Sequence, residues 1–255
     1  MKVALFDFDG TLSLLRAGWV NVMVPMMVDE LAALRNGESA DQLHTVVREF
    51  VDRLTGKQTI YQMIELARQV QLRGGVSEDA LVYKRRYLDL LHARIAHRLD
   101  ALDTGKAAPE QYLVPGSIAM LEGLRQRGLR LYLASGTDEE FMRREADLLR
   151  VTKYFDGGVF GALDDYKSFS KSILIQRILA RAECHGTDIL GFGDGYVEIE
   201  NVKAVGGIAV GVATDEGKCQ VVDAWKRDRL VGAGADYIVP NYLGHEELLG
   251  RIFSK

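Results

Sequence analysis

The chain has few cysteines and no long hydrophobic run. Only Cys184 and Cys219 occur among its 255 residues, and they form no CxxC pair. This scarcity is typical of a cytoplasmic protein and argues against a disulfide scaffold. No apolar stretch approaches the roughly 18 residues that span a bilayer, and the run at residues 3–6 is too short for a signal peptide. We therefore expect a cytoplasmic protein with no membrane partner.

An excess of positive charge is also absent. The chain carries 32 basic and 36 acidic residues, a formal net charge of -4, which disfavours a nucleic-acid partner bound through a basic surface. No GxxxxGK[ST] loop occurs, and residues 191–195 do not complete a GxGxxG, so nucleotide-cofactor binding has no support. The five histidines show no metal-binding spacing. What remains is ordinary globular composition, 47% hydrophobic and 27% charged.

Short apolar runs indicate the fold. Such runs, with helical segments between several of them, are typical of strands buried on both faces of a parallel sheet. They lie at residues 3–6, 129–134, 189–192, 208–212 and 237–239. The alternation predicts an α/β fold with a doubly wound parallel sheet, whose ligands bind at the carboxyl ends of the strands.

A long segment after the first run breaks this alternation. Between residues 15 and 109 the apolar residues recur at helical spacing, which predicts an inserted all-helical domain. The α/β part would then comprise residues 1–14 and 110–255, and residues 100–110 would form the return linker. The Met-rich stretch 23–27 is more typical of a hydrophobic core than of a binding groove.

Two acids follow the first predicted strand, in the string Asp7-Phe8-Asp9-Gly10-Thr11. Asp7 and Asp9 are two residues apart, so both side chains can leave a strand on the same side. One carboxylate could attack an electrophile while the other moves protons. The alternative is that the Asp-Gly pair marks only a turn.

Two further motifs could bind an anion. Ser135-Gly136-Thr137 follows the second predicted strand, where a hydroxyl and backbone amides can hold anionic oxygens, or where Ser135 or Thr137 could cap the next helix. Lys171 begins a predicted helix, and a positive charge there opposes the helix dipole unless it has another task. Lys167 competes for that task, and either lysine could be a solvated surface residue.

A second pair of acids lies in Gly193-Asp194-Gly195-Tyr196-Val197-Glu198. Asp194 ends a predicted strand, and Glu198 is one helical turn further on, where it can face the same side. Two carboxylates and a backbone oxygen suit Mg²⁺. The alternative is that Asp194 caps a helix and Glu198 is a first-turn acid.

In this order the four motifs resemble the haloacid dehalogenase-like hydrolase superfamily in its phosphatase branch, and the helical insert resembles that family's C1 cap. The resemblance implies that Asp7 is a nucleophile that forms an aspartyl-phosphate and that Asp9 is the general acid and base. It implies that Ser135 and the Gly136 amide bind the transferring phosphoryl group, which Lys171 steadies together with Asp7.

The resemblance also implies a Mg²⁺ cofactor. Its ligands would be the Asp7 carboxylate, the Asp9 carbonyl and Asp194, with Glu198 acting through waters. The family often has Asp at the position of Glu198, and residues 167–171 lack the family's common Lys-Pro pair, which keeps Lys167 as a rival. Independently of the resemblance, so many acids would repel a phosphate ester unless cations neutralised them.

These features predict a Mg²⁺-dependent phosphatase acting on a small phosphorylated metabolite, such as a sugar phosphate. The alternatives are a phosphotransferase of the β-phosphoglucomutase type, a haloacid dehalogenase, which would need neither Asp9 nor Mg²⁺, and a non-enzymatic protein that binds phosphometabolites. Substrate selection is expected from the insert through Arg16, Trp19 and Lys57, although Trp19 could be core and Lys57 solvated. The sequence does not indicate an oligomeric state.

Overall fold

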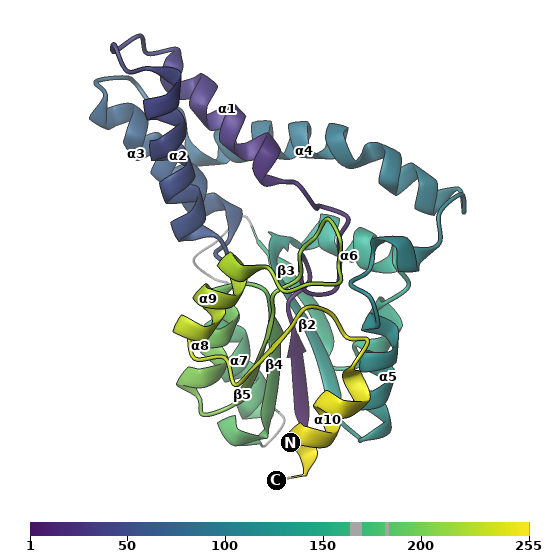
Figure 1. Ribbon diagram of the computed structural model, residues 1–255. Coiled ribbons are helices and arrows are strands. Elements are labelled where there is room, and N and C mark those ends of the chain that lie inside the picture. Colours follow the sequence, from purple (N-terminus) through teal and green to yellow (C-terminus); the bar gives the residue numbers. More distant parts are fainter. Residues whose placement is uncertain (164–169, 182–183, 255) are drawn as a thin grey trace. The chain divides into compact units, whose positions relative to one another are not determined.

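The chain forms two compact units, which a computed structural model describes at residues 1–163, 170–181 and 184–254 (Figure 1). Residues 1–17 and 98–255 make up the first, which we call the sheet unit, and residues 18–97 make up the second, the helical unit. The insertion therefore begins three residues later than the sequence pattern placed it, and the chain returns to the sheet unit before residue 110.

Six parallel strands form one sheet in the order β3-β2-β1-β4-β5-β6. The strands are β1 (Val3–Phe6), β2 (Arg130–Asp138), β3 (Gly158–Ala162), β4 (Ile189–Gly193), β5 (Ile208–Val212) and β6 (Tyr237–Val239). The predicted doubly wound α/β fold is confirmed. Only β3 escaped the sequence pattern, because glycine occupies two of its five positions and leaves no apolar run.

The strand order reverses between β1 and β4. From β1 the chain adds β2 and β3 on one side, and it then returns to add β4, β5 and β6 on the other. Ligands of open α/β sheets bind at such a reversal, outside the carboxyl ends of the strands. The ends of β1 and β4 therefore mark the place where a site is expected, and Asp7 and Asp194 directly follow these two strands.

Helices cover both faces of the sheet (Figure 1). Ala4 and Phe6 face the core beneath α5 (Ser117–Gln126), α6 (Glu139–Leu148) and α10 (His245–Phe253). Val3 and Leu5 face the opposite core, beneath α7 (Lys171–Arg181), α8 (Tyr196–Ala204) and α9 (Ala224–Gly232). All four residues of β1 are buried, which explains why its sequence is continuously apolar instead of alternating.

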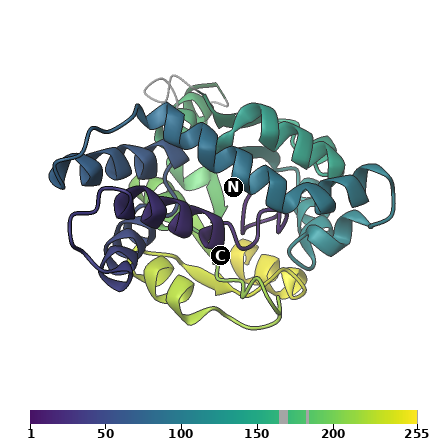
Figure 2. The same ribbon diagram turned by 90° about the horizontal axis from the view of Figure 1, so that it is seen from above.

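The helical unit contains α1 (Val20–Ala32), α2 (Ala40–Leu54), α3 (Thr59–Leu72) and most of α4 (Ala80–Asp103). In Figure 2, α4 is one long unbroken helix. It occupies the beginning of the expected return linker and ends before Gly105, whose φ of 69° favours glycine. Met23, Met26 and Met27 are buried in α1, and no helix of the described residues is long and apolar enough to cross a membrane.

Arg98 fixes the segment that leaves the sheet unit. Its Nη1 atom donates hydrogen bonds to the carbonyl oxygens of Leu15, at 2.7 Å, and Ala17, at 3.1 Å, and lies 3.4 Å from that of Leu14. One cationic side chain thus satisfies several backbone acceptors of a segment without regular structure. This tie explains why residues 15–17 belong to the sheet unit.

Replacing this arginine should destabilise the sheet unit. We expect Arg98→Met to lower the free energy of unfolding by about 2 kcal/mol, because partly buried carbonyls lose a charged donor. Arg85→Met is the control, since Arg85 is an exposed residue of the same helix. Urea denaturation of both variants measures the difference, and equal losses would show that Arg98 has no special role.

Candidate active site

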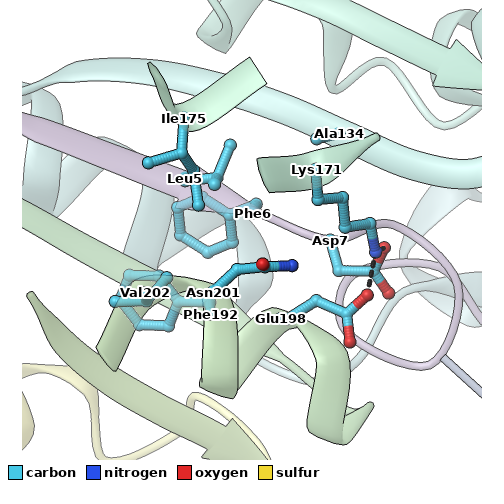
Figure 3. A pocket seen from close by; sticks show the side chains of 10 residues that line it. All are labelled: Leu5, Phe6, Asp7, Ala134, Lys171, Ile175, Phe192, Glu198, Asn201 and Val202. Carbon is cyan, nitrogen blue, oxygen red and sulfur yellow. Dashed lines mark hydrogen bonds and ion pairs between the residues drawn. The ribbon is translucent and has the colours of Figure 1, made fainter. Parts of the chain in front are cut away.

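Asp7 lies at the carboxyl end of β1 and is buried. Its backbone N–H donates a hydrogen bond of 2.9 Å to the Phe192 carbonyl of β4, which fixes the backbone at the strand reversal. The Lys171 ammonium lies 2.6 Å from Asp7 Oδ1 and also bonds Glu198. Figure 3 shows these three side chains pointing toward one another beside an apolar wall that includes Ile175.

This arrangement excludes the interpretations of Lys171 as a solvated surface residue and of Glu198 as merely a first-turn acid. Lys171 is 8% exposed, so it is not a solvated surface residue. Glu198 lies in the first turn of α8, but it too is buried and its carboxylate binds Lys171. It packs so closely on Gly193 that a Cβ there would overlap the glutamate side chain. Asp194 does not cap α8, because Gly195 holds that position.

The buried charges shift one another's pKa values. Burial raises the pKa of the Asp7 carboxyl well above its ordinary value, Lys171 opposes that shift, and Glu198 and Asp194 add to it. Burial alone would lower the pKa of Lys171, but the neighbouring Asp7 and Glu198 carboxylates raise it instead. The ammonium therefore stays charged, and the ionised form of Asp7 depends on positive neighbours.

Asp9 accepts hydrogen bonds from side chains at the carboxyl end of β2. Thr137 Oγ1 donates a 2.7 Å hydrogen bond to Asp9 Oδ2, and the Ser135 hydroxyl lies 3.4 Å from the same oxygen. Ser135 Oγ in turn accepts the Thr137 backbone N–H at 3.0 Å. The helix α6 begins only after Asp138. Ser135 and Thr137 therefore do not cap it, and both hydroxyls lie beside Asp9 at the carboxyl end of β2.

Arg16 approaches Asp9 from the other side. The Arg16 guanidinium binds the buried Glu145 carboxylate of α6, with Nη2 2.6 Å from Oε1 and Nε 3.0 Å from Oε2, and its Nε lies 3.9 Å from Asp9 Oδ1. Burial raises the pKa of Asp9 above its ordinary value, Arg16 opposes the shift, and Glu145 adds to it. Arg16 is thus a buried neighbour of Asp9 within the sheet unit and not a residue of the helical unit.

Asp194 has a different cationic partner. Lys226 of α9 places its ammonium 3.0 Å from Asp194 Oδ2 and 2.9 Å from Glu216 Oε1. The Asp194 carboxylate also packs against Gly10, where an added Cβ would overlap it. Burial raises the pKa of Asp194, and Lys226 opposes that shift. Gly10 also has a φ of 75°, so both its conformation and its surroundings require glycine.

The donor set fits a hard divalent cation that keeps some of its water. Asp9 Oδ1 and Glu198 Oε2 are buried and accept no hydrogen bond from the described residues. Within the same residues, no three Asp, Glu, His or Cys side chains gather into a ready metal site. Mg²⁺ commonly takes only one or two carboxylates and completes its shell with water. Asp7 and Asp194, whose charges influence each other, satisfy that demand.

Two expected residues belong to the helical unit. Trp19 is half-buried at the start of α1, and Lys57 is exposed between α2 and α3, both in the helical unit. Lys167, the rival of Lys171, lies outside the described residues. The structure therefore places Asp7, Asp9, Ser135, Gly136, Lys171, Asp194, Glu198 and Arg16 in the sheet unit; all but Arg16 lie on or after a strand or at the start of a helix.

Comparison with known families identifies the family of the chain. The family described as haloacid dehalogenase-like hydrolase matches residues 1–206. The chain belongs to this hydrolase family, and it is therefore an enzyme with the family's α/β core. No curated protein matches the chain.

Solved structures agree with the fold. A β-phosphoglucomutase from Clostridium difficile is 14% identical, with a TM-score of 0.63 and coverage of 98% of this chain and 96% of that one. A predicted phosphoglycolate phosphatase from Haemophilus somnus is 14% identical, with a TM-score of 0.62 and 98% coverage of both chains. A haloacid dehalogenase-like family protein from Streptococcus pneumoniae is 16% identical, with a TM-score of 0.60 and 98% coverage of both.

Sequence reasoning missed three residues of this region. Thr137 belongs to the motif Ser135-Gly136-Thr137, but the sequence suggested no role for it beyond capping the next helix. Glu145 and Lys226 carried no signal, because an acid and a lysine within amphipathic helices are usually solvated. Their partners Arg16 and Asp194 are 129 and 32 residues away in the chain, so only the fold brings them together.

Removing the partner of Arg16 should be costly. We expect Glu145→Gln to lower the free energy of unfolding by about 3 kcal/mol, because a buried guanidinium loses its carboxylate. The control is Glu247→Gln, which breaks an exposed pair with Arg251 and should cost about 0.5 kcal/mol or less. Chemical denaturation compares the two variants, and a similar small loss in both would contradict a structural role for the buried pair.

Proposed function

We propose that this hydrolase is a Mg²⁺-dependent phosphatase that cleaves a small phosphorylated metabolite through an aspartyl-phosphate. The observation that carries the proposal is the position of Asp7, a buried carboxylate at the strand reversal with the Lys171 ammonium 2.6 Å away. Asp9 lies two residues on, next to two hydroxyls. A nucleophile, a proton carrier and anion-binding groups are thus available at one edge of the sheet.

The first step would form a covalent bond to Asp7. One Asp7 carboxylate oxygen attacks the phosphorus, the phosphorus–oxygen ester bond breaks, and the leaving oxygen takes a proton from Asp9. A raised pKa suits this task, because a carboxyl group that keeps its proton can act as a general acid near neutral pH. The product alcohol leaves, and the phosphoryl group stays on Asp7.

The second step would restore the enzyme. Asp9, now a carboxylate, removes a proton from water, and the water oxygen attacks the phosphorus. The bond from phosphorus to the Asp7 oxygen breaks, so that phosphate leaves and Asp7 is a carboxylate again. The Ser135 hydroxyl and the Gly136 amide would bind the phosphoryl oxygens in both steps, and Lys171 would balance the charge on Asp7.

A bound Mg²⁺ would supply positive charge that neutralises the phosphoryl group and the carboxylates around it. The Asp7 carboxylate, the Asp9 carbonyl and Asp194 are the residues that would hold it. Glu198 was expected to act through waters. Since one of its oxygens binds Lys171, we assign it chiefly to positioning Lys171. Its other oxygen accepts no hydrogen bond from the described residues and could accept one from a metal-bound water.

A phosphomutase is the second candidate, because a β-phosphoglucomutase shares the fold. Such an enzyme would use the same residues but would transfer the phosphoryl group back to a sugar. Product analysis with a sugar phosphate distinguishes the two activities, since a phosphatase releases inorganic phosphate in proportion to the substrate consumed.

The nucleophile assignment is tested by Asp7→Asn. The amide has nearly the same shape but is a poor nucleophile, so we expect phosphate release to fall by roughly a thousandfold or more. Thermal unfolding should change little, because Lys171 keeps the Glu198 carboxylate as a partner. Asp147→Asn, at an exposed position of α6, is the matched control and should keep wild-type turnover. Activity near wild type in Asp7→Asn would remove Asp7 from this role.

The metal requirement is tested by chelation. Turnover should vanish in excess EDTA and return with Mg²⁺, because uncompensated carboxylates repel a phosphate ester. Asp194→Ala should raise the Mg²⁺ concentration needed for half-maximal rate by roughly tenfold or more, and Glu198→Ala should raise it less. Full turnover in EDTA would refute the metal, whereas equal effects of the two variants would refute only this ranking.

Substrate selection is tested in the helical unit. The residues around Asp7 recognise the phosphoryl group alone, so selection needs other side chains, and we assign it to Trp19 and Lys57. In Trp19→Ala and Lys57→Ala, kcat/KM for the preferred metabolite, relative to that for acetyl phosphate, should fall roughly tenfold. A ratio equal to that of the wild type would show that neither residue recognises the substrate.

A further inference from the structure

Lys226 binds Asp194 in a way that the proposed reaction does not use. It is the third residue of α9, and its side chain is only 13% exposed. Its ammonium bridges two acids, with Asp194 Oδ2 at 3.0 Å and Glu216 Oε1 at 2.9 Å. A positive charge in the first turn opposes the helix dipole, so the two carboxylates, and not the helix, account for its position.

Lys226 is not the sole support of Asp194. The Asp194 carboxylate also packs against Gly10, so closely that a Cβ at that position would overlap it. Asp194 follows directly on β4, whose residues pair with β1 and β5 on both sides. The carboxylate is therefore confined by backbone even without the ammonium, and the main effect of Lys226 on Asp194 is electrostatic.

We propose that Lys226 is a counter-ion that competes with the divalent cation for Asp194 and thereby sets the Mg²⁺ concentration at which the site fills. The inference rests on the proposed function in one respect, the assignment of Asp194 as a metal ligand. A carboxylate that already accepts an ammonium hydrogen bond offers less negative charge to a second cation, and the two cations repel each other.

The charges around the site support this competition. When ionised, the four carboxylates of Asp7, Glu198, Asp194 and Glu216 carry four negative charges, and Lys171 and Lys226 carry two positive ones. These six groups alone, without Asp9, Arg16 and Glu145 beside them, carry a net charge of −2, which one divalent cation would neutralise. Without Lys226 the same cluster would carry −3 and would attract Mg²⁺ more strongly.

Glu216 should have the opposite effect to Lys226 and strengthen the affinity of the site for Mg²⁺. Its carboxylate shares the ammonium with Asp194, so it draws part of the positive charge of Lys226 away from the site. A neutral residue at position 216 would leave the ammonium to Asp194 alone and would also remove one negative charge from the cluster. Both changes weaken the attraction for Mg²⁺.

The experiment is calorimetric titration of the metal-free full chain with MgCl2, which needs no substrate. We expect Lys226→Met to bind Mg²⁺ roughly tenfold more tightly than wild type and Glu216→Gln to bind it roughly threefold more weakly. Lys226→Arg keeps the charge and should bind like wild type. Lys203→Met is the matched control, since Lys203 of α8 pairs with Asp236 instead and its loss should leave the affinity unchanged.

Equal or weaker Mg²⁺ binding by Lys226→Met, with thermal unfolding like that of wild type, would overturn the inference and show that Lys226 merely positions Asp194. If Lys226→Met does not fold, unchanged affinity in Glu216→Gln overturns it. Wild-type protein that binds no Mg²⁺ yet hydrolyses phosphate esters in EDTA would instead refute the metal in the proposed function. The two failures are therefore distinguishable.

Discussion

Buried negative charge at the carboxyl edge of the sheet is the constraint on which the surrounding structure depends. An ionised carboxylate removed from water is tolerated only beside cations and hydrogen-bond donors. The buried Asp7 meets this need through Lys171, and the half-buried Asp9 and Asp194 meet it through Thr137 and Arg16 and through Lys226, respectively. Each cation or donor comes from a different element, so the acids also tie the end of the sheet to the helices around it.

This constraint also explains why each cation beside these acids contacts a further carboxylate. Lys171 needs Glu198 as a second acceptor, and Arg16 needs Glu145, because a buried cation with a single weak partner is as unfavourable as a buried anion. The same argument applies to Lys226 and Glu216. The site is thus a network of alternating charges, and under the proposed function a cation or a phosphoryl group that enters it would exchange partners with groups that are already charged.

The sequence predicted the fold better than the network. Five of the six strands were visible as short apolar runs, because strands buried on both faces cannot alternate with polar residues. The acids that follow β1 and β4 were visible because they directly follow those runs. The strand β3 was not, since its glycines carry no hydrophobic signal.

The cationic partners were harder to find. Lys171 was recognised as a residue whose charge opposes its helix, but its contact with Glu198 depends on how α7 and α8 pack on the same face of the sheet. Glu145 and Lys226 lie within helices, where charged residues are ordinarily solvated. The sequence pattern assigned Arg16 to the helical insert. The hydrogen bonds from Arg98 that hold residues 15–17 in the sheet unit join positions more than 80 residues apart, so the pattern could not predict them.

The central claim is that Asp7 carries the phosphoryl group, and mass spectrometry tests it most directly. In Asp9→Asn, acetyl phosphate should still phosphorylate the enzyme because its leaving group needs no proton, but the loss of the general base should slow hydrolysis. Borohydride reduction and peptide mapping should then place the modification on Asp7, and the double variant with Asp7→Asn should carry none. Phosphorylation of another residue, or none in Asp9→Asn while wild type hydrolyses acetyl phosphate, would contradict the account.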